Sequence, residues 1–184
     1  MKRLALVVPL VVAFLAGTLG ISVTGTEPKL AAHGPTSVAG TEKTAVFRVG
    51  KRTVREVRYA DRETLVYSFA LANEGRVPVT VTGLAPLEAD PRLFRYLTLT
   101  DTEGQERFTI PGGSRTRVEL SMRMHSCETL SARAGSFATQ VALHVERAAV
   151  LEDVVTVDLP EEVHTGSPRE ASCPNATATS RPPG

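Results

Sequence analysis

The chain of 184 residues has no tryptophan, only two cysteines and an aromatic content of 5%. This composition excludes a disulfide-dense miniature scaffold and an aromatic-rich binding surface. Lysine is scarce as well, because 17 of the 21 basic residues are arginine. Beyond residue 23 the chain has 19 basic and 20 acidic residues, a net charge of −1. Without an excess of positive charge, the chain is not expected to bind nucleic acid.

The sequence also lacks the motifs of common catalytic and redox sites. The triplet Gly112-Gly113-Ser114 differs from the G-x-S-x-G elbow that exposes a nucleophilic serine. Glu152 and Asp153 are adjacent, so on a strand they point to opposite faces and cannot act together as an acid–base pair. The two cysteines form no C-x-x-C motif. We therefore expect no enzymatic activity and no cofactor.

An uncharged stretch of twenty residues, 4–23, follows Lys2 and Arg3. As a helix rising about 1.5 Å per residue, it would span roughly 30 Å, the thickness of the hydrocarbon core of a membrane. The basic pair before it favours a cytoplasmic N-terminus. The stretch predicts a single-pass transmembrane helix, with the rest of the chain outside the cytoplasm. The alternative is a cleaved signal peptide and a secreted protein.

Two other segments are poor in patterned apolar residues. Residues 24–43 mix glycine, proline, threonine and serine without a sustained period, which predicts a flexible stalk between the membrane and the folded domain. Residues 161–184 include four prolines and almost no large apolar side chain, which predicts an irregular tail. The folded domain is therefore expected over residues 44–160.

The clearest strand pattern in this domain lies in residues 64–84. Large apolar side chains occupy every second position of its first arm, at Leu65, Tyr67, Phe69 and Leu71. This is the period of a β-strand. A second apolar–polar alternation begins at residue 77, and Asn73 and Gly75 lie between the two arms. Because asparagine and glycine tolerate the backbone angles of tight turns, we expect a β-hairpin here.

Further short runs with strand character follow along the chain. They are residues 45–49, 53–59, 93–100, 108–110, 115–124, 136–146 and 151–159. The first two are expected at a sheet edge, where Arg52, Arg55 and Arg58 would discourage pairing with other chains. Gly112 and Gly113 predict a tight turn. No run of helical period follows residue 23, so the sequence predicts an all-β domain, an antiparallel β-sandwich of seven to nine strands.

Two segments of this domain resemble a known pattern. The run FALANEGRVPVTVTGL begins at Phe69, and FTIPGGSRTRVEL begins at Phe108. Both resemble the turn-and-strand motifs of bacterial immunoglobulin-like β-sandwich modules of secreted or membrane-anchored proteins. The resemblance implies an immunoglobulin-like fold and an exported location. Such modules serve as spacers, adhesion surfaces and assembly partners, so it also implies a structural or protein-binding role with an unknown partner and no catalytic residue.

Cys127 and Cys173 are the two cysteines of a chain expected outside the cytoplasm. Paired thiols are usual in oxidising compartments, so we expect a disulfide between them. This bond would tether the C-terminal tail to the region that follows the run 115–124.

The segment from residue 122 to residue 127 contains a set of soft ligands for Cu(I): Met122, Met124, His125 and Cys127. This set gives the alternative prediction of an extracytoplasmic copper-binding protein. The two methionines, however, continue the apolar face of the run 115–124, which assigns them to the core. We therefore expect a structural or protein-binding module without a metal site.

Overall fold

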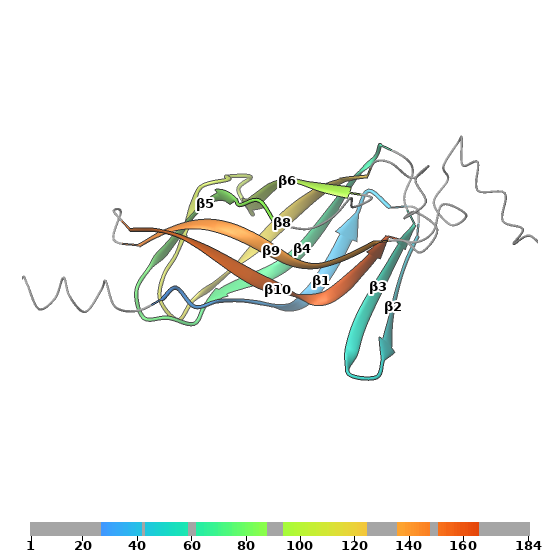
Figure 1. Ribbon diagram of the computed structural model, residues 1–184, viewed down its shortest axis with the longest axis horizontal. Coiled ribbons are helices and arrows are strands. Elements are labelled where there is room, and N and C mark those ends of the chain that lie inside the picture. The colour runs from blue at the N-terminus through green and yellow to red at the C-terminus, as the bar shows by residue number, and fades with distance from the viewer. Residues whose placement is uncertain are drawn as a thin grey trace, which may run out of the picture.

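The computed structural model describes residues 27–41, 43–58, 62–87, 94–124, 136–147 and 151–165. Within these ranges the regular elements are ten β-strands (Figure 1). They are β1 (Leu30–Ala39), β2 (Lys43–Val49), β3 (Arg52–Arg58), β4 (Thr64–Asn73), β5 (Val79–Leu84), β6 (Phe94–Asp101), β7 (Phe108–Ile110), β8 (Arg115–Met124), β9 (Ser136–Arg147) and β10 (Leu151–Thr165). No helix long and apolar enough to cross a membrane occurs in these ranges. The predicted transmembrane segment, residues 4–23, lies outside them.

The strands form two sheets that enclose one core. The four-stranded sheet has the order β1-β4-β8-β6, and the six-stranded sheet has the order β2-β3-β10-β9-β5-β7. One cluster of buried apolar side chains draws residues from both sheets, which is the arrangement of a β-sandwich. The predicted all-β sandwich is confirmed, although the described residues form ten strands instead of the expected seven to nine. The pairing departs from a purely antiparallel pattern at one place, because β3 and β10 run parallel.

The apolar alternation in β4 and β8 lies on the inner face of the four-stranded sheet. Leu65 and Phe69 of β4, and Leu120 and Met122 of β8, are all 0% exposed. Consecutive side chains of a strand point to opposite faces, so one face of each strand fills the core while the other faces away from it. The faces predicted for these two strands are confirmed.

The predicted hairpin at residues 64–84 is wrong, because its two arms belong to different sheets. β4 pairs with β1 and β8, whereas β5 pairs with β7 and β9. Both edges of each strand are thus occupied, and none remains for β4 and β5 to pair with each other. The segment between them crosses from one sheet to the other, so that the apolar faces of both strands meet in the core.

The predicted stalk is also wrong over much of its length, because Leu30–Ala39 forms β1. β1 pairs antiparallel with β4, and its ladder shifts register between His33 and Ser37. Gly34 and Pro35 lie at this shift and interrupt the sequence period, since proline is confined to bulges and edges in sheets. Leu30 and Val38 nevertheless pack against the core.

The C-terminal boundary lies further along the chain than expected. β10 continues to Thr165, and its ladder with β9 shifts register between Asp158 and Val163, around Pro160. The strands therefore run from residue 30 to residue 165, instead of the expected 44 to 160. Residues 166–184, most of the predicted tail, lie outside the described part of the chain.

The β2–β3 hairpin projects away from the rest of the sandwich (Figure 1, lower right). β2 is the edge strand, and β3 lies between β2 and β10. The expectation that Arg55 guards the sheet edge is wrong, because Arg55 is buried. Its side chain points inward on the same face as Val57, and the buried carboxylate of Glu161 lies beside it.

Candidate functional site

The potential copper ligands within the described part of the chain belong to the core. Met122 and Met124 are fully buried in the main apolar cluster, and Met122 lies opposite Leu65 across the β4–β8 ladder. His125, Cys127 and Cys173 lie outside the described residues, so the disulfide stays a prediction. Within the described ranges, no three His, Cys, Asp or Glu residues are placed to hold a metal ion together.

The four turn residues singled out in the sequence lie together where the chain crosses between the sheets. The side-chain nitrogen Nδ2 of Asn73 donates to the backbone carbonyls of Val77 and Ile110, at 2.8 and 3.0 Å. Its side-chain oxygen accepts a hydrogen bond from the backbone of Gly75 at 3.0 Å. One buried side chain thus satisfies three backbone groups, which would be costly to leave unpaired.

The turn between β7 and β8 closes onto this crossing. The backbone nitrogen of Gly113 donates to the carbonyls of Asn73 and Gly75, at 2.9 and 3.0 Å. Gly112 packs against the backbone of Arg76, where an added Cβ would lie 2.3 Å from the carbonyl oxygen. A side chain at position 112 would clash, so glycine is required by this close approach. We call these residues, Asn73, Gly75, Gly112 and Gly113, the crossing junction.

A hollow of about 470 Å³ lies beside the crossing junction. Its charged lining residues are Glu27, Lys29, Glu74, Arg76 and Arg147. Both signs are present, and the guanidinium of Arg147 donates to Asp153 at 2.7 Å. The lining therefore does not select a ligand of one charge.

A buried polar cluster, which the sequence did not indicate, lies at the base of the β2–β3 hairpin. Arg55 forms an ion pair with Glu161, and the two side chains are 11% and 5% exposed. The guanidinium also donates to the hydroxyls of Thr36 and Thr44, at 3.0 and 3.1 Å. Because these partners come from β10, β1 and β2, the cluster fixes the base of the hairpin to both sheets.

Tyr67 is next to this cluster on β4. Burial, together with the nearby carboxylate of Glu161, raises the pKa of its hydroxyl well above the ordinary value. The hydroxyl is fully buried and lies close to the side chains of Glu161 and Thr36. The carboxylate of Glu161 forms its ion pair with Arg55, so Tyr67 is buried beside a charged pair.

Large apolar side chains that remain exposed gather on the hairpin. Among the described residues they are Val46, Phe47, Val49, Leu97, Phe137 and Val154, with exposed fractions between 38% and 58%. Three of the six belong to β2. Monomeric soluble domains rarely keep such side chains together at the surface without a use for them.

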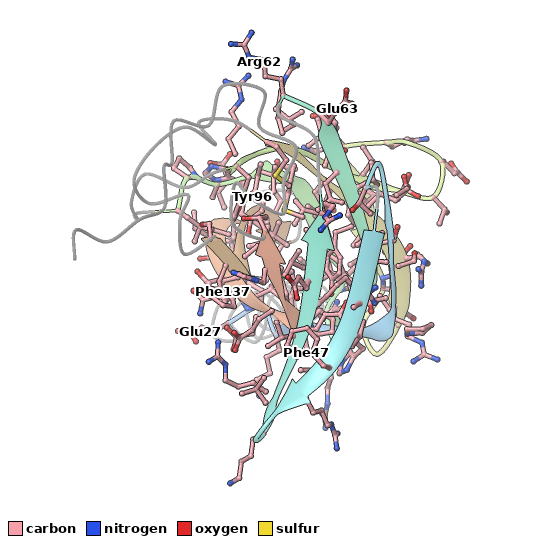
Figure 2. All side chains as sticks on the ribbon, turned by 90° about the vertical axis from the view of Figure 1, so that its right-hand side faces the viewer. Glu27, Phe47, Arg62, Glu63, Tyr96 and Phe137 are labelled. Atoms are coloured by element: carbon pink, nitrogen blue, oxygen red, sulfur yellow. The ribbon has the colours of Figure 1, made fainter. Side chains whose placement is uncertain are left out.

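The strand registers place Phe137 of β9 on the same face of the six-stranded sheet as Phe47 of β2; both residues are labelled in Figure 2. Phe47 is opposite Val54 across the β2–β3 ladder, and Val54 is opposite Glu162 of β10. His164, two residues further along β10, is opposite Phe137. Because opposite residues share a face, all of them lie on the outer face of the six-stranded sheet, where Val54 is covered by its neighbours and is only 5% exposed. We call Phe47, Val49 and Phe137 the outer patch.

Charged and aromatic contacts order the inner part of this face. The rings of Phe137 and His164 stack with centroids 4.5 Å apart. The guanidinium of Arg52 lies 5.7 Å from the centre of the Phe137 ring, within reach of a cation–π interaction. Arg52 also forms an ion pair with Glu162. The hydrogen bonds that the guanidinium donates within this pair lower the pKa of the Glu162 carboxyl. Phe137 is therefore held by its neighbours, whereas Phe47 and Val49 of the outer patch lie on the edge strand β2, 42% and 53% exposed.

The chain has no match among protein-family models, and no curated protein matches its sequence. Solved structures similar to it include the cupredoxin domain of amoB from Nitrosocaldus yellowstonii, with 14% identity and a TM-score of 0.28 over 66% of this chain. Another is the Northeast Structural Genomics Consortium target SoR45, with 11% identity and a TM-score of 0.32 over 73% of this chain and 87% of that one. This chain spans 65% of the length of the first. At TM-scores this low, neither similarity carries an argument about function.

Proposed function

We propose that this protein is an exported, membrane-anchored β-sandwich module that binds a protein partner and has no catalytic activity. The observation that carries the binding role is the outer patch, because its side chains are exposed and do not belong to the apolar cluster that the two sheets bury between them. Exposed apolar patches on otherwise well-packed domains are typical of protein-binding surfaces.

The immunoglobulin-like assignment is part of this proposal. The two sequence segments that resemble those modules meet at the crossing junction, where Asn73 accepts the hydrogen bond of Gly113. Their shared turn residues thus hold the two sheets in place, which supports the resemblance. The copper-binding alternative is weaker, because both of its methionines are occupied in the core.

The anchor and the export are tested by fractionating the native host. We expect the full chain to sediment with membranes, to keep residues 4–23 on N-terminal sequencing and to be digested by protease added to intact cells. A Val11→Arg, Val12→Asp variant should no longer be retained in the membrane, because charges at the bilayer centre are costly. A mature start at about residue 20 to 30 with protein in the medium would replace the anchor by a signal peptide.

The binding role is tested in the same cells by photo-cross-linking from single positions. A cross-linking residue in place of Phe47 or Phe137 should give the same discrete adduct, since both lie on the outer patch. The matched control is the exposed Leu97 on β6, which should give none. An identical adduct pattern from all three positions, or no adduct from any of them, would contradict a binding role for this face.

A further inference from the structure

The four edges of the two sheets differ in how they are protected. β7 has only three residues. The ladders of β1 and β6 each contain a register shift, between His33 and Ser37 and between Tyr96 and Thr98. Short edges and bulges are devices that prevent an edge from pairing with another chain. β2 has neither, because its ladder with β3 runs without a shift from Lys43 to Val49.

The free side of β2 is accessible along its length. Every residue from Thr44 to Gly50 is exposed, and within the described residues β2 pairs with β3 alone. Successive backbone groups of an antiparallel strand alternate between its two sides. One set of N–H and C=O groups bonds to β3, and the other is directed away from it. β2 therefore offers hydrogen-bonding groups to one more strand.

The charge of the hairpin is opposite to that of the remaining chain. Residues 43–58 contain six basic residues and one acidic residue, a net charge of +5. The rest of the chain beyond residue 23 has 13 basic and 19 acidic residues, a net charge of −6. Glu161 and Glu162 neutralise Arg55 and Arg52. Arg48 and Lys51 are exposed and form no ion pair within the described part of the chain.

We propose that β2 accepts an extended, acidic segment of a partner protein as an additional strand. This inference rests on the proposed function and specifies how the partner binds. Backbone groups of β2 bind the segment, and its apolar side chains cover Phe47 and Val49 on the outer face. Its acidic side chains lie on the other face, beside Arg48. The partner segment is thus one in which apolar and acidic residues alternate.

A second copy of the chain is a poorer occupant, although it has the same backbone groups. Two hairpins of net charge +5, or +3 once the pairing of Arg52 and Arg55 with Glu162 and Glu161 is counted, would approach each other in a β2–β2 pairing, and like charges oppose such contacts. An acidic segment removes this repulsion and pairs with Arg48 and Lys51.

The probe is a blocked, labelled octapeptide in which valine and glutamate alternate, added to the full-length chain in neutral detergent micelles. We expect it to bind, to bind more weakly as salt is raised, and to slow hydrogen exchange in β2 but not in the edge strand β6. A matched peptide in which valine and lysine alternate should bind at least about tenfold more weakly, a difference of ~1.4 kcal/mol.

Two double variants locate the site. Phe47→Ser with Arg48→Glu should weaken binding of the valine–glutamate peptide at least about tenfold. The control is Leu97→Ser with Arg95→Glu, the same change of chemistry at exposed positions of β6, and it should leave binding unchanged. Circular dichroism checks that both variants fold. If the variant Phe47→Ser with Arg48→Glu does not fold, the single variant Lys51→Glu in the hairpin turn replaces it. This variant should also weaken binding of the valine–glutamate peptide.

Several outcomes would overturn the proposal. They are equal binding of the two peptides, no binding of the acidic peptide up to about 1 mM, or protection from exchange outside β2. Self-association abolished by Phe47→Ser with Arg48→Glu would assign the edge to a second copy. Protection of β2 by anionic micelles without peptide would assign it to a lipid surface. Because the peptide test uses purified protein, it can fail while fractionation supports the anchored module, and the reverse also holds.

Discussion

The β4–β8 and β2–β3 ladders are both antiparallel and free of register shifts, yet their environments are opposite. In β4 and β8 one face is buried in the core. In β2 every residue from Thr44 to Val49 is exposed. Backbone hydrogen bonds contribute a modest net stability in either place. The difference lies in the apolar area removed from water, which is large in the first ladder and small in the second.

The hairpin is nevertheless attached firmly at its base. Val57 of β3 belongs to the core cluster, and Arg55 is held by Glu161, Thr36 and Thr44. The exposed part begins only beyond these contacts. An ordered strand whose apolar side chains are not used for folding is suited to bind another chain, because little ordering is required on binding.

The largest contrast is expected between one phenylalanine from each ladder. Phe69→Ala should lower the free energy of unfolding by about 3–5 kcal/mol, because the ring is fully buried and its removal leaves a cavity. Phe47→Ala should cost less than about 1 kcal/mol, since its ring is 42% exposed. Urea denaturation of the full-length chain measures both. Equal losses would show that Phe47 contributes to the core and is not a free surface residue.

The next contrast is between two neighbouring carboxylates on β10. Glu161→Ala leaves the buried guanidinium of Arg55 without its counter-ion and should cost about 3 kcal/mol. We expect the lower end of the range for buried pairs, because the hydroxyls of Thr36 and Thr44 still bind Arg55. Glu162→Ala removes the exposed pair with Arg52 and should cost less than about 1 kcal/mol.

The same denaturation measurements test this contrast, and a double substitution supplies the control. Replacing the pair by Arg55→Met with Glu161→Leu should recover most of the loss, since apolar residues can replace a buried ion pair. If Glu161→Ala were as mild as Glu162→Ala, the buried cluster would not be what holds the hairpin base.

The sequence predicted the parts of this fold that depend on a local period. The buried faces of β4 and β8 follow from alternation alone, because a strand has two faces and the apolar one turns inward. The partner of each strand does not follow from it. Asn73 and Gly75 indicate a reversal of the chain equally well for a hairpin and for a crossing between sheets. The deciding contacts, from Asn73 to Ile110 and from Gly113 to Asn73, are distant in sequence.

Other features were missed for related reasons. β1 is interrupted by Gly34 and Pro35 at its register shift, so its strand period is broken. Arg55 and Glu161 are 106 residues apart, and a charged residue in an edge-like strand is normally assigned to the surface. The exposed side chains of β2 could be recognised only after the position of β2 in the sheet was known.

The smallest effect concerns the pH dependence of two exposed ion pairs of the six-stranded sheet, Arg107–Glu146 and Arg52–Glu162. Hydrogen bonds from Arg107 and Arg52 lower the pKa of Glu146 and Glu162. In the unfolded chain these carboxyls titrate near the ordinary value of about 4.3. A depressed pKa in the folded state contributes stability above that pH, and the contribution is lost as the pH falls through the lower, folded-state pKa. The double variant Glu146→Gln, Glu162→Gln should therefore show a smaller loss of stability between about pH 5 and pH 3 than the unmodified chain. Because Arg52 and Arg107 are more than half exposed, the difference should be small and should shrink at high salt.

Glu119→Gln on the exposed face of β8 is the control. If that variant changed the pH profile as much as the double variant does, the two ion pairs would contribute nothing specific to the acid stability of the fold.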